Sequence, residues 1–93
     1  MQQGQATAER AALLALLHTQ PVPKRIRTLR QLHELSHETL AERIRGMTDL
    51  RTSRWSVGNW ERGDRGASRG HRPVAKARAA LAAIFDVPVE TFD

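Results

Sequence analysis

The chain contains no cysteine and no tyrosine, and aromatic residues make up only 4% of it. Without cysteine it can form neither a disulfide nor a thiolate metal site, which fits a reducing cytoplasmic compartment. No run approaches the roughly 18 apolar residues that a membrane span needs, so we expect no membrane partner. The short apolar block at 11–17 has neither a basic run before it nor a cleavage site after it, so we interpret it as an amphipathic helix and not as a signal peptide.

Acidic residues are the scarcer charged type, with 10 Asp and Glu against 15 Lys and Arg. The excess is concentrated in residues 51–78, where eight basic residues meet two acidic ones, so that this segment carries 8 − 2 = +6 and the rest sums to 5 − 6 = −1. The basic residues are Arg51, Arg54, Arg62, Arg65, Arg69, Arg72, Lys76 and Arg78. Clustered arginine indicates a polyanionic partner. The alternative is a solvated basic face that serves solubility.

Apolar spacing predicts an all-α fold of five or six helices, without strands. We expect helices over 6–18, 24–34, 37–45 and 54–62, a fifth one with Pro73 in its first turn, and a short closing turn over 87–92. The two prolines in 20–23 divide the chain into an N-terminal amphipathic helix with its linker, residues 1–23, and a domain of residues 24–93. Ser36 and Ser53 are expected N-caps, and Gly46 and Gly63 are expected helix stops.

The core positions follow from the same spacing. We expect the following side chains to face inward: Leu13, Leu16, Leu17, Ile26, Leu29, Leu32, Leu40, Ala41, Ile44, Val74, Ala77, Leu81, Ile84 and Phe85. Two helices joined by a turn, the second basic at its start, are typical of helix-turn-helix DNA binding. A plain helical bundle would show the same periodicity.

Three segments help to separate these alternatives: LSHETLAERI at 35–44, VGNWERG at 57–63 and VPVETF at 87–92. Together they resemble the Xre family, the phage repressor and Cro-like helix-turn-helix domains, over roughly residues 24–93. The resemblance implies a lambda-repressor-like bundle of about five helices, here with an extra N-terminal helix. It also implies a transcription regulator, most simply a repressor, that binds double-stranded DNA in the cytoplasm, associated with the nucleoid, as a possible homodimer. No enzymatic activity, cofactor or metal is expected.

The resemblance assigns roles to particular positions. Ala41 corresponds to the small residue where the paired helices cross, and Val57 and Trp60 to the buried face of the recognition helix. Arg54, Trp55 and Asn59 are implied to read bases, with Arg54 suited to guanine and Asn59 to adenine. Trp55 could instead be a second core aromatic. Contacts to the DNA backbone are implied for His37, Arg51, Ser53, Arg62, Arg65, Arg69 and Arg72.

Two features depart from the family pattern. The connector at 47–52 is longer than the usual turn of about three or four residues, which puts the angle between the paired helices in doubt. The segment at 63–72 is also long, and its arginines follow the DNA backbone, enter the minor groove, or belong to an ordinary solvated loop.

Residues 33–37, HELSH, match the HExxH pattern of zinc proteases, with Glu61 as a nominal third ligand. The chemistry needs both histidines on one continuous helix, whereas Leu35 and Ser36 indicate a helix boundary. We therefore do not expect a zinc site. The main alternative function is a protein-interaction module, such as an antitoxin or a phage-encoded inhibitor. An apolar patch on the recognition helix would mark it.

Overall fold

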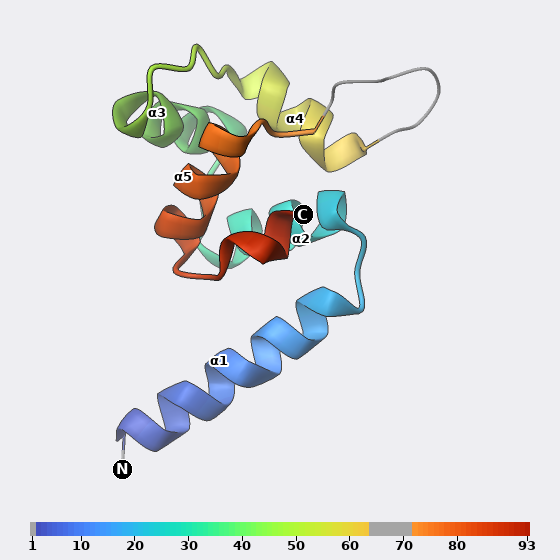
Figure 1. The fold of residues 1–93 in the computed structure, drawn as a ribbon, viewed down its shortest axis with the longest axis vertical. Coiled ribbons are helices and arrows are strands. Elements are labelled where there is room, and N and C mark those ends of the chain that lie inside the picture. Colours follow the sequence, from blue (N-terminus) through green and yellow to red (C-terminus); the bar gives the residue numbers. More distant parts are fainter. Residues whose placement is uncertain (1, 64–71) are drawn as a thin grey trace.

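The structure is a computed structural model that describes residues 2–63 and 72–93. Within these ranges its regular elements are all helices, which confirms the predicted all-α class. In chain order they are α1 (Gln2–His18), α2 (Val22–Leu32), α3 (His37–Met47), α4 (Arg54–Arg62), α5 (Ala75–Phe85) and the 3-10 helix η1 (Val89–Phe92) (Figure 1). Arg65 and Arg69, for which the sequence predicts contacts to the DNA backbone, lie outside the described residues.

Local capping chemistry sets the starts of the two central helices as predicted. The Ser36 hydroxyl accepts a hydrogen bond from the Thr39 amide at 3.0 Å. Ser53 accepts one from the Ser56 amide at 3.3 Å, and the Ser56 hydroxyl completes a capping box. These side chains satisfy amides that have no partner within the helix.

The two glycines predicted to end helices behave differently. Gly63 does end α4, with a positive φ of 67°. Gly46 lies inside α3, which continues to Met47 and is capped by Thr48, so the predicted stop at Gly46 is wrong. Gly46 does not adopt the positive φ with which a glycine typically ends a helix.

The prolines interrupt the helices less than predicted. The second helix begins at Val22, not at residue 24, with Pro21 as its N-cap and Pro23 inside its first turn. A proline is tolerated there because the amides of the first turn have no carbonyl partner within the helix, so the hydrogen that proline lacks would make no helical hydrogen bond. The first helix also starts earlier than expected, at Gln2.

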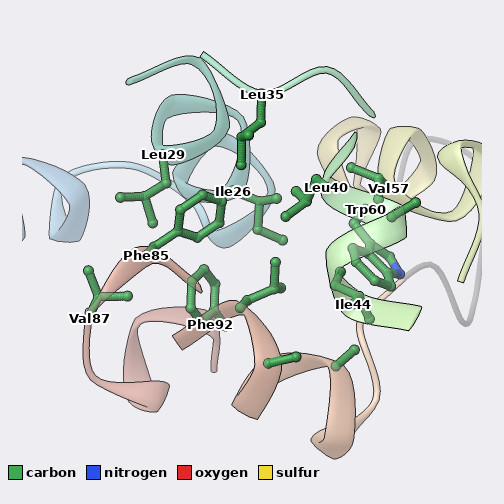
Figure 2. Close-up of a cluster of buried hydrophobic side chains, with 14 of the residues drawn as sticks. Ile26, Leu29, Leu35, Leu40, Ile44, Val57, Trp60, Phe85, Val87 and Phe92 are labelled. Atoms are coloured by element: carbon green, nitrogen blue, oxygen red, sulfur yellow. The ribbon is translucent and has the colours of Figure 1, made fainter. Parts of the chain in front are cut away.

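One hydrophobic core holds the helices together. It contains Ile26 and Leu29 from α2, Leu40 and Ile44 from α3, Val57 and Trp60 from α4, Leu81 and Phe85 from α5, and Phe92 from η1 (Figure 2). The helices α3 and α4 pack closely, α2 lies against α4, and η1 packs against both α5 and α2. The core therefore fixes the inner face of α4.

Three of the side chains expected inside are exposed. Leu16 is 52% exposed, Leu32 59% and Val74 55%. Leu32 is the last residue of α2, and Leu35, beyond the turn through Glu34, is buried in the core. The fifth helix begins at Ala75, so Pro73 precedes it and does not lie in its first turn, and Val74 is its N-cap and not part of its inner face.

The first helix touches the rest of the fold mainly through its C-terminal end. Figure 1 shows α1 extending away from the other helices toward the N-terminus. Leu17 is fully buried in the core, and Leu13 and Leu14 pack against it. A surface ion pair of 3.0 Å between Arg10 and Asp86 adds a second attachment. Among the described residues, no helix has both the length and the apolar character to cross a membrane.

Candidate nucleic-acid interface

The paired helices α3 and α4 form the unit that presents the predicted site. Ala41 is fully buried, as expected for the small residue between them, and so is Val57. Trp60 is 7% exposed and anchors the C-terminal half of α4. With its inner face fixed in this way, α4 turns the opposite face to solvent.

The long connector between the two helices, residues 48–53, is held at both of its ends. Arg45 of α3 donates to the carbonyl of Thr52 at 2.6 Å. The Thr48 hydroxyl donates to the carbonyl of Ile44 at 2.8 Å. Both bonds return the connector to α3, so its extra length stays close to the helix that precedes it.

The middle of the connector is tied to α5. Lys76 pairs with Asp49 at 3.0 Å. The hydrogen bond and charge of Lys76 hold the pKa of the Asp49 carboxyl below its ordinary value of 3.8. A basic residue of the 51–78 segment therefore serves here to position the connector.

The start of α4 carries the most exposed part of the site. Trp55 is 66% exposed, so the alternative that placed it in the core is wrong. The Arg54 guanidinium lies over its ring, 5.2 Å from the centroid. Arg51, on the connector just before the helix, is also exposed. Two arginines and a large aromatic ring therefore occur together at the N-terminal end of α4.

The remaining predicted residues of α4 continue along the same helix. Asn59 is partly buried and follows Trp55 by four residues, and Arg62 follows by three more, so these side chains share one face. Arg62 donates a hydrogen bond to the side-chain oxygen of Asn59. Ser53 is partly buried, and its hydroxyl serves as the helix cap.

His37 lies apart from this group, beside the other end of α4. Its Nε2 is 3.2 Å from Oε1 of Glu61, a carboxylate whose side chain is only 6% exposed. Arg30 donates two hydrogen bonds to the same carboxylate, of 2.6 and 3.0 Å, and a third to the carbonyl of Leu35. His37 and Arg30 thus form a clamp on Glu61, which ties α4 to α2 and to the start of α3.

Sequence reasoning missed this clamp. Arg30 and Glu61 are 31 positions apart, and neither lies in a pattern that demands a partner. The only available signal was a charged residue directly after the buried Trp60, since a charge near a core face needs a counter-charge.

The two histidines of the HExxH pattern are separated by a helix boundary, as the sequence predicts. The α2 helix ends before His33, and Glu34 adopts a left-handed φ of 54°. The ring of His33 packs against that of Phe85 in a tilted arrangement, with centroids 5.0 Å apart, while His37 contacts Glu61. In the described part of the chain, no three His, Cys, Asp or Glu side chains converge as metal ligands would.

Lys76 and Arg78, two C-terminal members of the basic segment, are paired away from the exposed face of α4. Lys76 pairs with Asp49, and Arg78 pairs with Asp93 at 3.5 Å. Arg72 is exposed and lies near the C-terminal end of α4. Part of the +6 charge of the segment is therefore used to hold the fold together.

No protein-family model, curated protein or solved structure matches this chain. The resemblance to Xre domains consequently rests on the three sequence motifs described above.

Proposed function

We propose that this protein is a transcription regulator that binds duplex DNA sequence-specifically, with the exposed face of α4 in the major groove. One observation carries the proposal: Arg54 and Trp55 project into solvent from the start of a helix whose other face is buried in the core. The major groove, about 12 Å wide, admits one helix, and residues near the helix N-terminus reach base edges there.

The side chains of α4 divide into two roles in this proposal. Arg54 binds guanine with two hydrogen bonds, and Asn59 binds adenine after its oxygen is released by Arg62. Arg51 neutralises a phosphate, and so does Arg62 once it has left Asn59. Trp55 supports the Arg54 guanidinium by a cation–π contact and offers its ring to a thymine methyl group.

Repression by occluding a promoter is the simplest output of such binding. One recognition helix covers only a few base pairs, so we propose that two copies bind half-sites about 34–36 Å apart. The protein would then act as a homodimer on DNA, in the cytoplasm where the nucleoid lies.

The most direct experiment selects bound sequences from random duplexes and then tests variants on the selected site. Arg54→Ala and Asn59→Ala should each cost about 1–3 kcal/mol on that site and relax the preference at one base pair. Arg51→Ala should weaken selected and random DNA alike. Arg43→Ala, at an exposed position of α3, is the matched control and should change little.

Two outcomes count against the proposal. If the selection recovers no preferred sequence, sequence-specific binding is ruled out. If Arg54→Ala lowers the affinity for selected and random DNA equally, its role in base reading is ruled out. Affinity should also fall steeply with salt, by roughly 0.9 in log K per phosphate contact for each unit of log salt. An affinity that stays flat from low to moderate salt would contradict the electrostatic part of the proposal.

A second candidate function, binding to a protein partner, is favoured by the 66% exposure of Trp55. Tryptophan is enriched among the residues that dominate protein interfaces. The selection of DNA sequences separates the two candidates, and Trp55→Ala then tests the protein contact. If a protein is the target, this variant should abolish its capture, and the parent protein should show no preferred DNA sequence in the selection.

A further inference from the structure

A pocket of about 850 Å³ opens at the C-terminal end of α4, where five parts of the chain meet. Its walls come from the linker after α1, the first turns of α2, the end of α4, the approach to α5 with part of that helix, and the end of η1. Pro23, Ile26, Trp60 and Phe92 contribute apolar surface. Its volume and mixed lining are those of a small-molecule site, for which about 300–1,000 Å³ is usual.

The charges around the pocket favour an anion. Five basic and two acidic side chains line it, a formal balance of 5 − 2 = +3. Both acidic groups are already paired, Glu61 with Arg30 at 2.6 Å and Asp93 with Arg78 at 3.5 Å. Lys24, in the first turn of α2, makes no ion pair with any described residue. The rim therefore keeps positive charge that the described part of the fold does not neutralise.

Trp60, which lines the pocket, carries a hydrogen-bond donor. This residue is only 7% exposed, yet its indole N–H has no acceptor among the described residues. No fully enclosed side-chain polar atom lacks a partner in this part of the chain, so Nε1 is accessible to solvent and able to donate to a ligand.

We propose that this pocket binds a small organic anion with a flat, apolar body. The body packs on the apolar surface of Pro23 and Phe92, an acceptor atom takes the Trp60 N–H, and the anionic group lies toward Lys24. Aromatic carboxylates have this chemistry. The proposal does not depend on DNA binding, because the pocket lies at one end of α4 and Arg54 at the other, roughly 12 Å away for a rise of about 1.5 Å per residue.

Two-dimensional ¹H–¹⁵N NMR of the full chain tests the pocket directly, because the protein has only two tryptophans and hence two indole N–H signals. Trp55→Phe assigns the signal of Trp60. The probe is 2-naphthoate, and its neutral isostere 2-naphthylmethanol is the control ligand. We expect 2-naphthoate to move the Trp60 signal saturably and further than the Trp55 signal. The alcohol should bind about tenfold more weakly, since hydrogen bonds to charged groups are stronger than neutral ones.

A matched pair of variants tests the charge requirement. Lys24→Glu should weaken 2-naphthoate about tenfold, since it replaces an attraction by a repulsion, whereas Arg43→Glu, outside the pocket, should leave the affinity unchanged. The idea is overturned if the Trp60 signal does not move, if the alcohol binds as tightly as the acid, or if Arg43→Glu weakens binding as much as Lys24→Glu.

Discussion

Two glycines of the paired helices have opposite backbone requirements. Gly63 combines a φ of 67° with a ψ of −152°, a region that is essentially restricted to glycine, and an added Cβ would lie 2.9 Å from Cγ of Pro23. Gly46 sits inside a helix, and a Cβ added there would meet nothing from other parts of the fold within 4 Å. Only the first of these glycines is required by the fold.

Alanine at the two positions should therefore change stability in opposite directions. Gly63→Ala should lower the free energy of unfolding by about 1–3 kcal/mol, because both the backbone and the contact with Pro23 are strained. Gly46→Ala should raise it by about 0.5–1 kcal/mol, because alanine loses less backbone entropy in a helix. Urea unfolding of the three proteins measures both. A neutral Gly63→Ala would show that the end of α4 can rearrange away from Pro23.

Sequence reasoning succeeds for residues whose environment is local. Ser36 and Ser53 cap helices that begin one residue later, and this depends only on neighbouring amides. The sequence does not decide the position of Trp55, because an aromatic residue on a short helix suits a core as well as a surface. Its exposure depends on which other helices pack nearby, and no local pattern carries that information.

At the level of the elements, the clamp on Glu61 holds α4 in place. The side chains of Arg30 and Glu61 are only 12% and 6% exposed, so little solvent screens them. Removing one partner of a buried pair leaves the other charge without compensation, which is more costly than losing an exposed pair.

Glu61→Gln should lower the free energy of unfolding by about 3 kcal/mol. Glu38→Gln is the matched control, since Glu38 pairs with Arg45 at 3.5 Å on the surface, and it should cost less than about 1 kcal/mol. The double variant Arg30→Met with Glu61→Leu should recover much of the loss, because it leaves no buried charge unpaired. Equal small effects for Glu61→Gln and Glu38→Gln would mean that the buried pair behaves as a surface pair.

The attachment of the connector to α5 should weaken in acid, because Asp49 becomes protonated. Its pKa is lowered in the fold by Lys76, so the pair stabilises the fold above the ordinary pKa of 3.8, and this contribution is lost as the pH falls through the lower folded pKa. Thermal melting should show a lower Tm for Lys76→Gln than for the parent protein at neutral pH, and equal Tm values once Asp49 is protonated. A difference in Tm that persists unchanged in acid would mean that Lys76 acts by packing and not by charge.

Across the whole molecule, the fold class follows from helical periodicity, but the attachment of α1 does not. The sequence leaves open whether its leucines fold back or meet a partner. The structure buries Leu17 fully and leaves Leu16 52% exposed, because successive helical residues point about 100° apart. Tertiary packing selects one of two adjacent leucines, and the apolar spacing alone does not distinguish them.

Variants at these two adjacent leucines distinguish a role of α1 in folding from a role in assembly. Leu17→Ala should cost about 2–5 kcal/mol of unfolding free energy, as buried leucines do, and Leu16→Ala should have little effect on melting. If exposed α1 surface pairs two copies on DNA, Leu16→Ala should instead reduce the dimer seen by sedimentation with a duplex of two half-sites. An unchanged dimer would place the contact between copies elsewhere.

Because α1 is attached at its C-terminal end, the helical repeat fixes the direction in which its free N-terminal end faces relative to the core. Each residue turns the helix by about 100° and advances it by about 1.5 Å, so a fluorescent domain joined in helical register to Gln2 would keep a fixed bearing relative to the core. One alanine inserted between Ala11 and Ala12 would rotate the joined domain about the helix axis by about 100° and lengthen the helix by only about 1.5 Å. The Arg10–Asp86 pair would be lost. Energy transfer from the domain to a dye on the core would then change through orientation far more than through distance.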